Sequence, residues 1–133
     1  MPIERITQAQ LHAEMKAQGV TNERHIAFIC VVCGTIQSVA SLIKAGATED
    51  QAKRAIGFAC EGRFRNAGPW PRGSDKGPRA RARRKVRGCD WTLGGLFRIH
   101  EREVEMPDGT VHPTFRLASP QAAQQLQTEM EAA

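Results

Sequence analysis

The sequence of 133 residues predicts a small α+β domain with short antiparallel strands, two or three helices and a long basic loop. Stretches with helix-capping residues alternate with short runs of β-branched and aromatic residues. Residues 65–88, rich in arginine, glycine and proline, contain almost no aliphatic side chain that could bury a face. The length fits one modest core. We divide the chain into an N-terminal helix (1–24), a core with the basic loop (25–118) and a C-terminal helical tail (119–133).

Capping signals place the helices of the N-terminal half. Thr7 is followed three residues later by a glutamine and Gly19 ends the same stretch, which is typical of a short capped helix. "RHIAFICVVCG" predicts a buried strand that leads into a turn. "TIQSVASLIKAG" predicts a helix that stops at Gly46, and "TEDQ", which begins at Thr48, has the spacing of a second capping box.

The C-terminal half predicts strands followed by one helix. "AIGFACEGRF" has the composition of a strand and turn. The turn signal "PDG" lies between "GGLFRIHEREVEM" and "TVHPTFRL", so these segments predict a hairpin in which Phe97 and Ile99 face Phe115 and Leu117. Pro113 indicates that the return strand lies at a sheet edge. Ser-Pro at residues 119–120 predicts the start of an exposed, weakly amphipathic helix.

The cysteines predict a metal site. The chain has four, Cys30, Cys33, Cys60 and Cys89, with the spacing C-x2-C-x26-C-x28-C. The first pair precedes Gly34, and a tight C-x2-C-G turn can direct two thiolates at one ion. A site closed by four protein ligands has no position for water or substrate. The sequence therefore predicts one structural Zn²⁺ in a zinc-ribbon-like core.

Other interpretations of the cysteines remain open at this level. His25 or His100 could replace one of the two single ligands, because imidazole also binds zinc. The four thiols could also be buried, reduced and without a metal. A redox C-x2-C is less favoured, because the sequence lacks the βαβ setting of that motif.

The positive charge is concentrated in one segment. Residues 63–87 contain ten Lys or Arg and one acid, Asp75, which gives +9 and leaves −4 for the rest of a chain whose total is +5. Arginines that neutralise phosphates release counterions, and dense local charge indicates an anionic partner. Trp70 and Trp91 could stack on bases, although Trp91 is better explained as a core residue. The predicted partner contacts are Arg79, Arg81, Arg83, Arg84, Lys85 and Arg87.

Three segments together resemble a known family. "FICVVCGTIQS", "IGFACEGR" and "GCDWTLGGLFRIHEREVEMPDGTVHPTFRLA" are similar to a family of small uncharacterised bacteriophage and prophage proteins of zinc-ribbon type, over residues 26–118. The shared pattern is a C-x2-C-G knuckle, a C-x-G-R segment and a closing GCDWTLGGLF-x-IH hairpin. The resemblance implies the same four cysteine ligands and no particular activity. The run "RARARRKVR" is an insertion relative to that pattern.

We therefore expect a phage- or prophage-encoded, zinc-stabilised accessory protein that binds DNA or RNA nonspecifically through its arginine-rich loop. The alternative is a protein–protein inhibitor of a host factor, such as a defence (anti-CRISPR-like) or transcription complex, with an acidic or nucleic-acid-binding surface as its target.

We do not expect an enzyme, because His100 and His112 on the predicted hairpin have no accompanying nucleophile, phosphate cradle or open metal triad. The longest apolar run, Ile26–Cys33, has eight residues and no signal-peptide pattern precedes it, so we expect a cytoplasmic protein without membrane contact.

Overall fold

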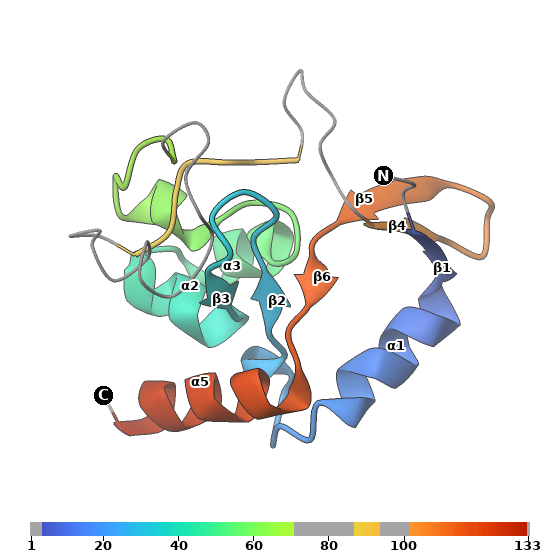
Figure 1. Cartoon of the computed structure of the whole chain (residues 1–133), viewed down its shortest axis with the longest axis horizontal. Helices are drawn as coiled ribbons and strands as arrows, with labels where there is room; N and C mark the ends of the chain where they lie inside the picture. The colour runs from blue at the N-terminus through green and yellow to red at the C-terminus, as the bar shows by residue number, and fades with distance from the viewer. Residues whose placement is uncertain (1–3, 71–86, 94–101, 133) are drawn as a thin grey trace.

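The computed structural model describes residues 4–70, 87–93 and 102–132 and confirms the predicted α+β class (Figure 1). The described residues form four α-helices, two 3₁₀ helices and two three-stranded sheets. In chain order the elements are β1 (Glu4–Thr7), α1 (Gln8–Ala17), η1 (Glu23–His25), β2 (Phe28–Ile29), β3 (Ile36–Gln37), α2 (Val39–Ala45), α3 (Glu49–Ala55), η2 (Glu61–Phe64), β4 (Arg102–Glu105), β5 (Val111–Thr114), β6 (Arg116–Leu117) and α5 (Pro120–Ala132).

The helices begin where the capping signals predicted. The Thr7 side chain accepts a hydrogen bond from the backbone of Gln10, whose own side chain binds the Thr7 backbone, so α1 has the expected capping box. Thr48 forms the same arrangement at the start of α3. Gly46 ends α2 with φ of 121°, a backbone conformation that glycine adopts without steric cost.

One sheet joins the N-terminus to the hairpin, in the order β1-β4-β5. Strand β4 pairs with β5 in the antiparallel hairpin predicted from "PDG", with Arg102 opposite Thr114. Pro113 lies in the edge strand β5, as predicted. His112 lies in β5 opposite Val104, while His100 lies outside the described residues.

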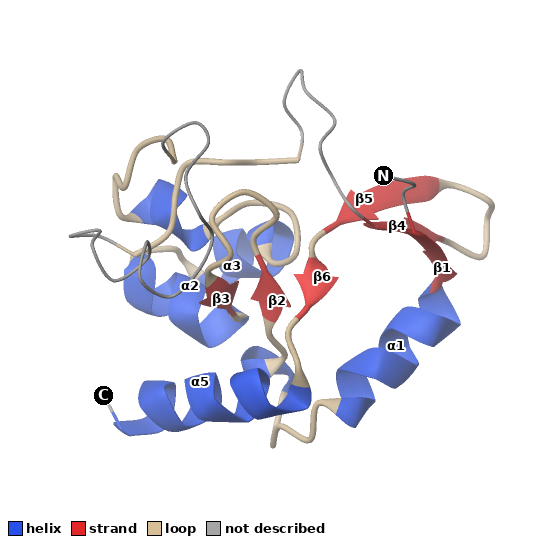
Figure 2. Ribbon diagram, in the orientation of Figure 1, coloured by secondary structure: helices blue, strands red, loops and turns tan. Residues whose placement is uncertain are grey.

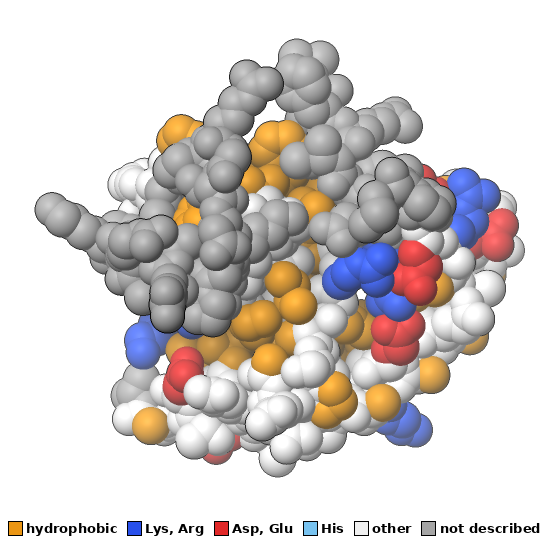
Figure 3. Space-filling view, viewed as in Figure 1, with side chains coloured by type: hydrophobic (Ala, Val, Ile, Leu, Met, Phe, Trp, Pro, Cys, Tyr) orange, Lys and Arg blue, Asp and Glu red, His pale blue; other side chains and the backbone are white. Residues whose placement is uncertain are grey.

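Strand β1, which the sequence did not predict, runs parallel to β4 and is fixed by ion pairs. Arg102 is buried and donates to Glu4 at 2.8 Å and to Glu14 at 2.7 Å. The hydrogen bond from Arg102 holds the pKa of the Glu4 carboxyl below its ordinary value. Arg5 pairs with Glu103 across the two strands. Acidic and basic side chains accordingly lie side by side at this end of the molecule in Figure 3.

The second sheet, in the order β3-β2-β6, is shorter than the sequence predicted. The strand expected in "RHIAFICVVCG" is limited to Phe28–Ile29, and Phe28 pairs with both Gln37 and Leu117. Leu117 therefore belongs to this sheet. Phe97 and Ile99 lie outside the described residues, so the predicted facing of these residues with Phe115 and Leu117 stays a prediction.

The strand predicted in "AIGFACEGRF" is wrong. That segment forms a single isolated bridge, between Ala59 and Thr92, and then enters η2. The bridge is flanked by two backbone hydrogen bonds, from Cys60 N–H to the Trp91 carbonyl and from Leu93 N–H to the Phe58 carbonyl. Pairing stops there because Cys60 turns into a buried cluster of sulfur atoms.

The C-terminal helix is less exposed than predicted. Ser119 caps α5 through its hydroxyl, as expected, but Ala123, Leu126 and Gln127 are buried. Figure 2 shows α5 running across one end of the molecule, where it contacts η1 and β3. The weakly amphipathic sequence therefore predicted the helix correctly but underestimated how much of it is buried. The division of the chain into residues 1–24, 25–118 and 119–133 stays a prediction.

Gln18 links three segments through buried hydrogen bonds. Its amide nitrogen donates to the carbonyls of Ala27 at 2.8 Å and Ala118 at 3.0 Å, and its amide oxygen accepts from the Ala27 N–H at 2.9 Å. The Gln18 side chain thus connects the chain after α1 to the segments before β2 and after β6.

The substitution Gln18→Leu should lower the free energy of unfolding by about 3 kcal/mol, because it leaves buried backbone groups without partners. Urea denaturation of this variant and of Gln125→Leu, a change at an exposed position of α5, provides the test. Equal midpoints for the two variants would contradict the role assigned to Gln18.

Within the described residues, none of the helices combines the length and the apolar character that crossing a membrane requires.

Candidate metal centre

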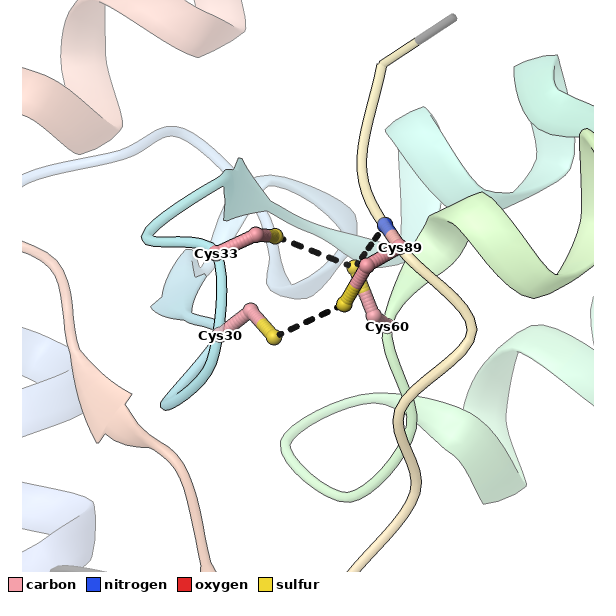
Figure 4. A group of neighbouring side chains, drawn as sticks. All are labelled: Cys30, Cys33, Cys60 and Cys89. Atoms are coloured by element: carbon pink, nitrogen blue, oxygen red, sulfur yellow. Dashed lines mark hydrogen bonds between the residues drawn. The ribbon is translucent and has the colours of Figure 1, made fainter. Parts of the chain in front are cut away.

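The four cysteines predicted as ligands lie together in the structure (Figure 4). Their sulfur atoms all lie within 4.8 Å of one another. Cys30 and Cys89 have their Sγ atoms 3.8 Å apart, and Cys33 and Cys60 have theirs 3.7 Å apart. All four side chains are buried, with at most 1% of the residue surface exposed. Residues separated by 59 positions in the chain therefore contribute to one closed site.

The spacing of the sulfur atoms fits a metal ion. Four thiolates placed tetrahedrally about 2.3 Å from one ion have their sulfur atoms about 3.8 Å apart. Sulfur atoms in a disulfide are only about 2.05 Å apart, and all four cysteines are free. Two of the six sulfur–sulfur separations therefore agree with tetrahedral coordination, and the cluster has a donor set that could hold a metal ion.

A tight turn presents the first two sulfurs. The Gly34 N–H donates to the Cys30 carbonyl at 2.9 Å, and Gly34 has φ of 75°, which favours glycine. The Cys30 N–H donates to the Thr35 carbonyl, which brings the chain back on itself. The Thr35 hydroxyl shares a hydrogen bond of 3.1 Å with the Cys33 sulfur. These contacts form the knuckle that C-x2-C-G predicted.

Two glycines allow the other two ligands to approach each other. A Cβ atom on Gly62 would lie 2.3 Å from the backbone nitrogen of Cys89, so the two chains touch backbone to backbone there. Gly88, with φ of 90°, is equally close, since a Cβ atom on it would lie 2.7 Å from the backbone nitrogen of Gly62. This approach lets the Cys89 N–H donate to the Cys60 sulfur at 3.3 Å.

Hydrogen bonds among the thiols change their acidity. Contacts led by Cys33 raise the pKa of Cys30, while contacts led by Cys30 lower the pKa of Cys33. The hydrogen bond with Cys30 is also the main cause that lowers the pKa of Cys60 to about 7. The pKa values of the four thiols are thus shifted in opposite directions, down for Cys33 and Cys60 and up for Cys30 and Cys89. A bound cation would displace the remaining protons, since metal ligands must be deprotonated.

A buried carboxylate, Glu61, lies next to the ligand Cys60. The Ser41 hydroxyl donates to it at 3.0 Å, and Arg65 and Arg87 donate at 3.2 Å and 3.1 Å. Desolvation raises the pKa of the Glu61 carboxyl, and the attraction of Arg87 is the largest opposing influence. Arg87 also donates to the carbonyl of Ile36 in β3.

Gln37 connects the backbone of Glu61 to the sulfur cluster. Its amide nitrogen donates to the Cys60 sulfur at 3.5 Å, and its amide oxygen accepts from the Glu61 N–H at 2.8 Å. The sequence analysis did not identify Gln37, Glu61 or Gly62. A signal for the last two was present, since the charged residue and the glycine directly follow a predicted ligand in "CEGR".

Of the two histidines considered as alternative ligands, the structure describes His25 but not His100. His25 lies in η1 with its Nε2 atom 4.0 Å from Glu131, and the metal-type cluster found among the described residues contains only cysteines. His100 lies outside the described residues. The structure thus assembles the four-cysteine set without His25.

Of the predicted partner contacts, the structure describes only Arg87, whose side chain is about one-third exposed and engaged with Glu61. Trp91 is half-buried and packs against the cysteine cluster, which confirms its predicted core role. The other predicted contacts lie outside the described residues: Arg79, Arg81, Arg83, Arg84 and Lys85.

The fold and the cluster together define a small α+β protein with a cysteine site suited to a metal ion. The chain belongs to the VVA0879-like family, whose family model matches residues 7–118 and so includes all four cysteines. No curated protein and no solved structure matches the chain.

Proposed function

We propose that the protein is a zinc-stabilised accessory protein, encoded by a phage or prophage, that binds nucleic acid through its arginine-rich loop. Zinc is the ion of choice because a tetrahedral set of four thiolates is typical of structural zinc sites of the ribbon type. With all four positions filled by buried sulfurs, the ion stabilises the fold, and no residue is assigned a catalytic role.

The placement of the basic segment relative to the metal centre is the observation that carries the proposal. Residues 63–87 carry a net charge of +9, while the rest of the chain carries −4. Directly before residues 71–86, which lie outside the described residues, Trp70 packs against the cysteine cluster. On the other side, Arg87 binds Glu61 and is followed within two residues by Cys89. The metal centre therefore supports both ends of the most cationic part of the chain.

Such a segment would bind mainly by neutralising phosphates. Each neutralised phosphate releases counterions, so affinity falls as salt rises and depends little on base sequence. The compartment that fits this role is the cytoplasm of the host cell, where nucleic acid is accessible and thiols remain reduced.

Binding to a DNA or RNA oligonucleotide should be readily detected at low salt and should weaken steeply toward physiological salt. In the variant with Arg79, Arg81, Arg83, Arg84 and Lys85 replaced by alanine, the magnitude of the slope of log affinity against log salt should fall by about 4.5 on duplex DNA, because each phosphate that is no longer neutralised removes roughly 0.9 from it. Fluorescence anisotropy over a salt series measures both quantities.

A control variant loses the same charge outside the basic segment. It carries alanine at Lys16, Arg24, Lys44, Lys53 and Arg54 and should keep most of the salt slope. Absence of binding to DNA and RNA at low salt would contradict the proposal. Co-purification with a host complex, abolished by the five loop substitutions, would instead support an anti-CRISPR-like inhibitor of a host factor.

A further inference from the structure

A groove of about 1050 Å³ lies between α1 and the rest of the fold, away from the sulfur atoms of the metal centre. One wall is formed by α1 and the other by residues of α2 and α3 with their neighbours. The floor contains Phe28 and Ile26, which belong to or pack against the cysteine core. The apolar lining residues are Leu11, Ala13, Met15, Val20, Ile26, Phe28, Val39 and Ile56.

Helix α1 buries none of its residues, although it is part of a folded domain. Leu11 and Met15 are one turn apart and half-buried, and both line the groove. An isolated helix of about ten residues is marginal in water, and most helices are stabilised by packing of an apolar face. Figure 1 shows α1 beyond the β6 side of the β3-β2-β6 sheet, opposite α2 and α3. Met15 also packs against the cysteine core, whereas Leu11 lies on an apolar edge of the helix that lines the groove.

The charged residues of the groove are mainly basic. Lys16 and Lys53 contribute positive charge, against the single acid Glu23. Lys53 lies 3.8 Å from Glu49 on its own helix, and no ion pair to Lys16 is found among the described residues. An occupant with acidic side chains beside an apolar stripe would complement this lining.

We propose that the groove binds an amphipathic α-helix of a partner protein, with leucine-like residues against its floor and acidic residues toward Lys16 and Lys53. Amphipathic helices commonly bind in grooves through apolar anchors spaced three to four residues apart. Helix–helix packing at about 8–10 Å between axes would place such a segment against α1. A second copy of this chain is a poorer occupant, because it would bring the same basic lining toward Lys16 and Lys53.

This site is independent of the arginine-rich loop, so it can be tested separately. The probe is a fluorescein-labelled peptide of about 18 residues, with leucine at helical spacing i, i+3, i+4 and i+7 and glutamate elsewhere. A scrambled peptide with the same composition and charge measures nonspecific attraction to the basic loop. The ordered peptide should bind roughly tenfold more tightly than the scrambled one, because only the ordered peptide presents an apolar stripe.

Leu11→Glu should weaken binding of the ordered peptide roughly tenfold, while Ala9→Glu, an equal change at an exposed position of α1, should not. Lys16→Glu should weaken it more than Lys44→Glu, a charge reversal outside the groove. Unchanged metal content in each variant shows that the fold is intact. Equal affinity for both peptides, no effect of Leu11→Glu, or a dimer in sedimentation that excludes the peptide would each overturn the proposal.

Discussion

On the proposed assignment of a structural zinc ion to the cysteine cluster, replacing Cys89 by serine should remove most of that zinc and destabilise the core around it. Cys89 supplies one of four buried sulfurs, and its Sγ lies 3.8 Å from that of Cys30. Structural zinc sites contribute apparent binding free energies of about 10–16 kcal/mol at neutral pH. That range is as large as the whole free energy of unfolding of a typical domain, about 5–15 kcal/mol. Loss of one ligand should therefore convert a folded chain into one that is at least partly unfolded.

Metal analysis of the purified proteins should give about one equivalent of zinc for the wild type and a large loss for Cys89→Ser. His25→Ala is the matched control, because His25 is buried but does not belong to the cysteine cluster, and it should retain full occupancy. Near-stoichiometric zinc in Cys89→Ser would show that another group is the fourth ligand. Near-ultraviolet circular dichroism reports the accompanying loss of tertiary packing around Trp91.

The substitution Gly62→Ala, which adds a single methyl group, should destabilise the fold almost as much as Cys89→Ser, although Gly62 offers no ligand to a metal. The new Cβ of Gly62→Ala would lie 2.3 Å from the Cys89 nitrogen and 2.5 Å from the Cys89 oxygen, well inside any normal contact. The neighbouring atoms are backbone and cannot rotate away, so the segments that carry Cys60 and Cys89 must separate. We expect a loss of about 3 kcal/mol or more in unfolding free energy, together with weaker metal binding.

Gly109→Ala is the control for Gly62→Ala. Gly109 has φ of 90° but no atom within 4 Å of its added Cβ, so this change measures backbone strain alone, at about 1–2 kcal/mol. Thermal denaturation and zinc competition with a chelator compare the two variants. If Gly62→Ala were the milder change in both measurements, the close approach of the two ligand segments would not be a requirement of the site.

Local signals predicted the elements of this fold more successfully than its tertiary pairings. The capping boxes at Thr7 and Thr48 are determined by residues three positions apart, and both are present. Strand β1 was missed because Glu4–Thr7 has no strand pattern of its own and is stabilised by β4 and by Arg102. The strand predicted around Cys60 failed for the opposite reason, since its composition suits a strand but the chain must turn toward the other sulfurs.

The cysteine cluster was predictable because metal ligands are few in type and all four cysteines had to be accounted for. The residues that orient the cluster carry no comparable signal. Gln37 and Glu61 are polar residues that composition assigns to the surface, yet both are fully buried. Their positions depend on contacts between segments 24 residues apart, which no local pattern encodes.

The parallel pairing of β1 with β4 constrains how the chain can fold during its synthesis. Glu4 pairs with Arg102, so β1 has no partner in this sheet until the ribosome has added the residues of β4, about 100 positions later. The sulfur cluster imposes a similar delay, because its last member is residue 89. Contacts between such distant positions slow folding, since loops must close before any pairing is gained. A nascent chain that ends before residue 102 therefore lacks the partner of β1, and one that ends before residue 89 also lacks the last sulfur of the cluster.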